Sequence, residues 1–237
     1  MANHANDRTS PSSTNELTVW LRDGWKVMLK HFPALVLIAL VADLPLAFIS
    51  RAAESIDTGL VSTLVTLSTI AMITPLAKAT AIVAIDTWER GETGAVLGAF
   101  GALIRNLPVL LAASTLWCIG VFIGAGLVIV PGIIVLVLGQ CLMGAVILEN
   151  RSLKDATRRS RALVWPRFWN VLALFLIVQA VAGIASGILE AAAGTTITGL
   201  PLDIITRALT SPIAFAPLAM MFLRVTRGSD TNVAQAE

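Results

Sequence analysis

The chain has 237 residues, of which 56% are hydrophobic and only 14% are charged, and its mean hydropathy is +0.81. Because soluble domains carry about 45–50% apolar and about 25% charged residues, this composition excludes a soluble globular protein. The net charge of +2 says little by itself, since the placement of Lys and Arg along a membrane protein matters more than their sum.

The apolar residues gather in stretches of about 20 residues, the length that an α-helix needs to cross the hydrocarbon layer. The pattern predicts an all-α polytopic membrane protein with six spans. In chain order the predicted spans are 33–50, 59–88, 107–130, 133–148, 168–189 and 202–223. We expect a bend at Pro75 in the second span and a tight turn at Pro131-Gly132 between the third and the fourth.

Three amphipathic helices are predicted to lie in the membrane plane, one before each pair of spans. They cover residues 17–32, 96–107 and 149–165. In the first, apolar residues including Trp20 and Trp25 recur every three or four positions, and Lys and Arg lie on the opposite face, which is typical of a helix at a membrane surface. Three units of in-plane helix and two-span hairpin would make an internal repeat.

The membrane domain is predicted to cover residues 17–224, between two polar ends. Residues 1–16 are rich in Ser, Thr and Asn and lack the apolar segment of a signal peptide, so we expect the first span to direct insertion. Residues 225–237 offer no apolar face to bury. We therefore expect both ends to be disordered and cytoplasmic.

The distribution of basic residues predicts the orientation. With six spans, fourteen of the 17 Lys and Arg fall on the side of the two termini, Arg51 falls alone on the other side, and Lys78 and Arg207 fall within spans. By the positive-inside rule, we expect both termini of this multi-pass protein to lie on the cytoplasmic side of the membrane. Five of the six Trp lie at the same predicted interface, as an aromatic belt would.

Ionisable residues within the predicted spans are candidate functional residues, because a charge inside a membrane is costly. They are Asp43, Lys78, Asp203 and Arg207. Asp203 and Arg207 are spaced to pair on one helix, with Asp43 at a similar depth, whereas Lys78 is expected near the cytoplasmic face within reach of Asp86 or Glu149. Either these residues form a polar pathway for a proton, an ion or an anionic headgroup, or they satisfy one another and fix helix packing, with Lys78 snorkelling to the interface.

The most charged stretch of the chain is the third predicted in-plane helix. Its candidate residues for binding anionic lipid are Arg151, Lys154, Arg158, Arg159, Arg161 and, just beyond it, Arg167. Each surface Lys or Arg contributes about 1 kcal/mol to attraction by anionic headgroups. The same residues also serve as a topology determinant, and the two roles do not exclude each other.

Other features predict packing rather than chemistry. Gly120-x-x-x-Gly124 and Gly183-x-x-x-Gly187 favour close helix approach, within the bundle or between subunits. Cys118 and Cys141 lie in apolar runs, where a packing role is expected ahead of a redox pair. The sequence has no metal-ligand spacing, nucleotide-binding loop or hydrolase motif. We therefore expect no enzyme activity, no cofactor, no metal and no nucleic-acid partner.

A family resemblance is concentrated in residues 146–169. It rests on Val146-Ile-Leu-Glu149, Ala156, Arg159-Ser160 and Leu163-Val164-Trp165-Pro-Arg167-Phe168-Trp169, together with Gly24-Trp25 and the Pro131-Gly132 turn. With these residues the chain resembles the bacterial YciC-like inner-membrane proteins and the related membrane domain that precedes the catalytic barrel in some glycerophosphodiester phosphodiesterases. The resemblance implies a six-span bacterial membrane protein. No segment of these residues resembles the barrel, so hydrolysis is not implied.

These observations favour a non-enzymatic protein of the bacterial cytoplasmic membrane that binds membrane lipids, or a protein partner or second copy, in envelope maintenance. The alternative is a small transporter or exporter that uses Asp43, Asp203 and Arg207 within the membrane. A third class, a membrane-embedded enzyme of lipid metabolism, has no support from individual residues.

Overall fold

The computed structural model describes residues 13–56, 59–127, 129–193 and 200–234, and over these ranges the chain is all-helical, without strands. The helices are α1 Ser13–Lys30, α2 Phe32–Ile56, α3 Leu60–Glu89, α4 Ala95–Leu127, α5 Ile129–Leu138, α6 Leu142–Ile147, α7 Leu153–Val164, the 3-10 turn η1 Trp165–Arg167, α8 Phe168–Ala193 and α9 Leu200–Ala234. The all-α fold class is confirmed. The predicted disorder of residues 1–16 is wrong for residues 13–16, which form the first turn of α1, while residues 1–12 fall outside the described residues.

Four segments of the described chain are long and apolar enough to cross a membrane. They are Phe32–Ala53, Ala95–Gly124, Leu153–Ala193 and Pro201–Gly228. Helices suit this environment because each satisfies its backbone N–H and C=O groups internally, where no water is present to do so. The chain is therefore a helical membrane protein by length and composition.

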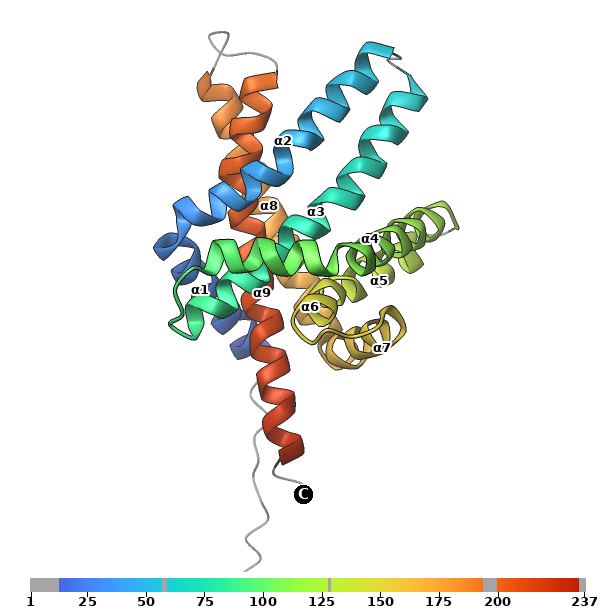
Figure 1. Cartoon of the computed structure of the whole chain (residues 1–237). Coiled ribbons are helices and arrows are strands. Elements are labelled where there is room, and N and C mark those ends of the chain that lie inside the picture. The colour runs from blue at the N-terminus through green and yellow to red at the C-terminus, as the bar shows by residue number, and fades with distance from the viewer. Residues whose placement is uncertain (1–12, 57–58, 128, 194–199, 235–237) are drawn as a thin grey trace, which may run out of the picture.

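Helix α9 forms the centre of the structure. Within an apolar stretch of 18 residues in Pro201–Gly228, 78% of the residues are buried, whereas the corresponding stretches of the other three segments are at most 33% buried. It packs against α1, α2, α3 and α8, and its Met221 and Phe222 side chains are almost completely buried. Figure 1 shows the α2–α3 and α8–α9 hairpins pointing toward the same end of the molecule, whereas the α4–α5 hairpin points to the side.

Two predicted boundaries are wrong. The second in-plane helix and the third span form one helix, α4, which continues through Pro108. The fourth span is broken into α5 and α6 at residues 139–141, and Pro131 lies in the first turn of α5 rather than in a turn between spans. Pro is tolerated there because the first N–H groups of a helix have no partner within that helix.

Side-chain hydrogen bonds and one contact with a distant helix accompany the break between α5 and α6. The carbonyl of Leu136 accepts a hydrogen bond from Gln140 Nε2 at 3.0 Å, and that of Leu138 accepts one from Ser160 Oγ of α7. Side chains thus satisfy carbonyls that a continuous helix would have paired with backbone N–H groups. Gly139 leaves space for the Trp117 indole, which a Cβ at this position would overlap.

Helix α1 is not simply a surface helix in the membrane plane. Trp20 and Met28 on its apolar face are buried in the protein core, against α9. The closest approach is at Gly24, where a Cβ would lie 2.9 Å from the Pro217 nitrogen and closer still to its Cα. The absence of a side chain at Gly24 therefore allows the two helices to touch.

The C-terminal end also differs from the expectation of disorder from residue 225, since α9 continues as a helix to Ala234. Ion pairs secure the part of α9 just beyond the apolar segment. Arg224 binds Asp23 of α1 at 2.7 Å, and Arg227 binds Asp86 of α3 at 3.0 Å and Glu89 at 3.5 Å. These contacts join three helices that are far apart in the sequence.

Candidate functional site

The basic helix α7 is held in a fixed orientation by its ends and its buried face. Ser152 caps its N-terminus by accepting a hydrogen bond from the Asp155 backbone N–H at 3.3 Å, and the Ser152 hydroxyl donates to the Asp155 carboxylate at 2.6 Å. Ala156, Ser160, Leu163 and Val164 are buried, and Ser160 donates to the carbonyl of Leu138 in α5. The opposite face of α7 is therefore presented outward.

The predicted lipid-binding residues fall into two groups. Arg151 and Arg159 both pair with Glu149, the latter at 3.3 Å, and Arg167 pairs with Glu16 of α1 at 3.4 Å. Ion pairs within the protein therefore occupy these three side chains.

Lys154, Arg158 and Arg161 form the second group, and all three are exposed. Within the part of the chain that the structure describes, none of them has a carboxylate within ion-pair distance. They line one shallow groove of about 420 Å³ together with Asp155 and Thr157. Their charge is available to a ligand from outside the protein.

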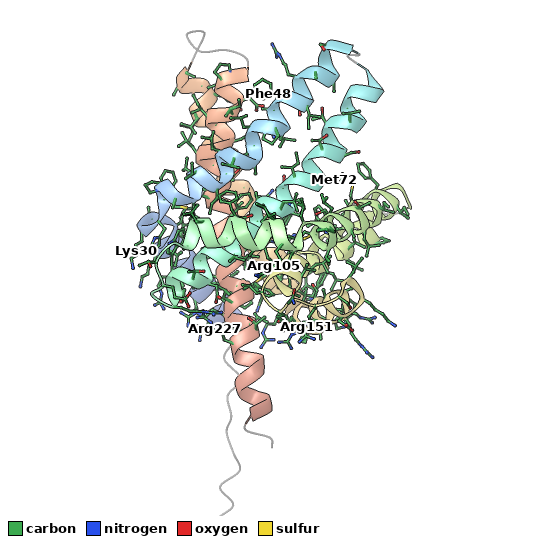
Figure 2. The ribbon with its side chains drawn as sticks, in the orientation of Figure 1. Lys30, Phe48, Met72, Arg105, Arg151 and Arg227 are labelled. Carbon is green, nitrogen blue, oxygen red and sulfur yellow. The ribbon has the colours of Figure 1, made fainter. Side chains whose placement is uncertain are left out.

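Two exposed tryptophans follow α7 along the chain, and the first of them lies beside Arg161 of the groove. Trp165 and Trp169 are 57% and 76% exposed, and the Arg161 guanidinium lies 5.8 Å from the centre of the Trp165 ring. Trp side chains of this kind favour the boundary between headgroups and hydrocarbon. Figure 2 shows Arg151 and Arg227 on the same side of the molecule, away from Phe48.

The intramembrane residues Asp43, Asp203 and Arg207 lie close together where α2 crosses α9. Arg207 Nε donates to Asp203 Oδ1 at 2.7 Å, the pairing within one helix that the spacing predicts. Asp43 is buried and accepts a hydrogen bond at 3.1 Å from the hydroxyl of Ser211, one turn beyond Arg207. Each of the three polar side chains therefore has a partner inside the protein.

Lys78 has a different partner from either of those expected. Asp86 pairs with Arg90 and Arg227, and Glu149 pairs with Arg151 and Arg159. Lys78 is only 8% exposed, and its Nζ donates to Gln140 Oε1 at 2.5 Å. The expectation of a carboxylate partner is wrong, and so is that of an ammonium reaching the interface.

A cavity of about 350 Å³ adjoins Lys78 inside the helical bundle. Its walls come from α3, α4, α6, α8, α9 and the break between α5 and α6. The lining residues are Thr74, Pro75, Lys78, Trp117, Cys118, Val121, Phe122, Gly139, Gln140, Met143, Phe175, Gln179, Ala214, Phe215 and Leu218. Most of the lining residues are apolar, and Lys78 is the charged residue among them. No local sequence pattern predicts this cavity, because it depends on contacts between distant segments.

The glycine and cysteine predictions can be placed on these helices. Cβ atoms at Gly120 and Gly124 would meet Val135 and Gly132, so this pair packs α4 against α5 as expected, whereas Gly183 and Gly187 have open space. Cys118 and Cys141 are buried free thiols. Among the described residues, no group of three or more His, Cys, Asp or Glu could hold a metal ion.

Comparison with known proteins adds no relative. No protein family matches the chain, and neither the curated proteins nor the solved structures contain a significant match to it.

Proposed function

We propose that this is a non-enzymatic integral protein of the bacterial cytoplasmic membrane that binds anionic lipid headgroups at its cytoplasmic face through α7, in envelope maintenance. The observation that carries the proposal is the outward group of Lys154, Arg158 and Arg161, which have no ion-pair partner among the described residues. Arg161 lies beside the exposed Trp165, and the exposed Trp169 follows one turn later in the chain. We also propose that the chain is a member of the YciC-like family.

The charges on α7 suit a phosphate-bearing headgroup. A guanidinium can donate two parallel hydrogen bonds to phosphate oxygens, and an ammonium adds a point charge. Each basic residue near an anionic surface contributes about 1 kcal/mol. Among the described residues none of these three side chains is within ion-pair distance of a carboxylate, and the Asp155 carboxylate of the same groove accepts from Ser152, so this attraction is available to the lipid.

The proposed topology has six spans with both termini in the cytoplasm. Support comes from α3, whose 30 residues would reach about 45 Å at about 1.5 Å per residue, more than the roughly 30 Å of the hydrocarbon layer. The pair α5–α6 would form the fourth span in spite of its break. The α4–α5 hairpin points sideways, unlike the other two hairpins. A topology experiment should therefore first check whether the third and fourth spans cross the membrane.

Reporter fusions test this topology. A reporter placed after Arg51 or Pro131 should lie in the periplasm, whereas one placed after Glu92, Arg151 or Arg227 should lie in the cytoplasm. If only the reporter after Pro131 departs from this pattern and gives a cytoplasmic signal, the number of spans is four. If any other reporter gives the opposite of its expected signal, the proposed orientation is contradicted.

The lipid-binding proposal is tested by titrating the purified protein, in neutral detergent, with short-chain phosphatidylglycerol and with the matching phosphatidylcholine. We expect tighter binding of the anionic lipid, weakened about 30-fold in Arg158→Gln/Arg161→Gln, since two surface charges contribute about 2 kcal/mol. Arg224→Gln is the matched control, because this arginine pairs with Asp23. Equal affinity of the double variant and wild type would contradict the proposal.

The alternative function, a small transporter, is favoured by the burial of Asp43 between α2 and α9. Asp203 pairs with Arg207 and Asp43 with Ser211, so helix packing already accounts for these residues. Alanine variants separate the two functions. Loss of transport in a stably folded variant supports the transporter, whereas loss of stability alone supports packing.

A further inference from the structure

We propose that the cavity beside Lys78 is a binding site for an anionic amphiphile with a single acyl chain, whose carboxylate or phosphate headgroup lies at the Lys78 ammonium. The site lies inside the bundle and shares no residue with the α7 groove. It is therefore independent of the proposed function at the membrane surface.

The first argument is charge. Lys78 is buried within the helical bundle, and its hydrogen-bond partner is the neutral amide of Gln140. Among the described residues no carboxylate pairs with it. A buried ammonium without a counter-charge is costly, and the cost is greatest inside a membrane. An anion in the adjoining cavity would supply the missing charge.

The second argument is the supply of hydrogen bonds. The Lys78 ammonium has three N–H donors, and Gln140 Oε1 accepts from it. Trp117 also lines the cavity, with its indole Nε1 packed against Gly139. Gln140 holds the ammonium in place, because its Oε1 accepts from Lys78 while its Nε2 donates to the Leu136 carbonyl. An ammonium is a donor without acceptor capacity, so an anionic oxygen satisfies it where a cation cannot.

The third argument is the apolar wall and its opening. Val121, Phe122, Phe175 and Leu218 contribute apolar side chains to the lining of the cavity. Phe122 is 39% exposed on α4 and Gln179 is exposed on α8, so the cavity reaches the outer surface between these helices. A ligand could enter from the bilayer without crossing water. An acyl chain matches this wall because it removes apolar surface from contact with polar groups.

The fourth argument is size. The cavity of about 350 Å³ lies near the lower end of the range for ligand pockets, roughly 300–1,000 Å³. This volume suits a small headgroup with one chain better than a phospholipid with two. The break between α5 and α6 fits the same interpretation, because irregular backbone within a membrane is tolerated where it lines a cavity.

The test compares three probes of equal chain length on the full-length protein: dodecanoate, dodecyl phosphate and the neutral dodecanol. Binding is measured by native mass spectrometry and by isothermal titration in neutral detergent. We expect at least one anionic probe to bind tenfold or more tightly than dodecanol, and the preferred anion identifies the headgroup class. Lys78→Met should remove this preference and leave dodecanol binding unchanged, whereas Lys78→Arg should restore part of it.

Lys154→Met is the matched control, because it removes an ammonium from the α7 groove instead of the cavity. It should leave binding of the anionic probes unchanged, and Lys78→Met should leave binding of phosphatidylglycerol at α7 unchanged, so the two proposals fail separately. Equal binding of dodecanol and both anions, or equal loss in Lys154→Met and Lys78→Met, would overturn the inference.

A second measurement covers the possibility that Lys78→Met does not fold. Dodecanoate carrying a bromine on its chain should quench part of the tryptophan fluorescence, and Trp117→Phe should remove that part. Quenching of equal size in wild type and Trp117→Phe would place the ligand elsewhere and overturn the inference.

Discussion

The contact between Gly24 of α1 and Pro217 of α9 offers a sharp test of the packing, because the expected sign of the effect differs from that at an open glycine. In Gly24→Ala the new Cβ would lie 2.9 Å from the Pro217 nitrogen and Cβ, and closer to its Cα. Backbone cannot rotate away as a side chain can, so α1 must move off α9. Such overpacking costs about 1–3 kcal/mol, and a backbone clash favours the upper end.

Replacing glycine by alanine within a helix also returns about 1 kcal/mol of helix propensity. The net expectation for Gly24→Ala is a loss of about 2 kcal/mol in the free energy of unfolding. Gly101→Ala in α4 is the matched control, since a Cβ there meets nothing within 4 Å. It should gain about 0.5–1 kcal/mol.

The assay is the free energy of unfolding in mixed micelles of a nonionic detergent and increasing sodium dodecyl sulfate, followed by tryptophan fluorescence. Two of the reporters, Trp20 and Trp25, lie on α1 itself. If Gly24→Ala is as stable as Gly101→Ala, α1 does not pack on α9 through this contact and the reasoning fails.

Three further predictions use the same assay. His31 stacks on Trp88 with ring centres 4.2 Å apart, and burial followed by the charge of Lys30 lowers its pKa from 6.5, so the folded protein favours the neutral ring. Stability should therefore be full above the ordinary pKa and decline as the pH falls below it, and His31→Phe should flatten this decline between about pH 7 and about pH 5; an unchanged slope would contradict it. Gly144→Ala would place a Cβ 2.6 Å from the Phe222 ring and should cost about 1–3 kcal/mol, whereas a neutral effect would show that the ring can turn aside. Arg207→Gln leaves the Asp203 carboxylate without its charged partner inside the predicted span and should cost more than about 1 kcal/mol; a smaller change would indicate that water reaches this pair.

Local sequence patterns were sufficient for most helices. Apolar runs of membrane length predict α2, α3 and α8, and the alternation of basic and apolar residues predicts α7 with its buried Ala156 and Ser160. The pairing of Asp203 with Arg207 follows from their spacing on one helix. These features depend on residues within one or two turns of each other.

The errors arise where distant segments meet. The hydrogen bond between Lys78 and Gln140 joins residues 62 positions apart, and no local pattern reports it. The break before α6 depends on Ser160 and Trp117, which come from other helices. Ion pairs with Asp23 and Asp86 similarly extend order along α9 into a segment whose composition alone is typical of disorder.

Native mass spectrometry of the protein, released gently from its own membrane, tests the proposed lipid binding most directly. We predict that wild type retains an anionic phospholipid and that Arg158→Gln/Arg161→Gln loses it, while Arg224→Gln retains it. Equal retention by all three proteins, or retention of zwitterionic lipid alone, would contradict a lipid-binding role for α7.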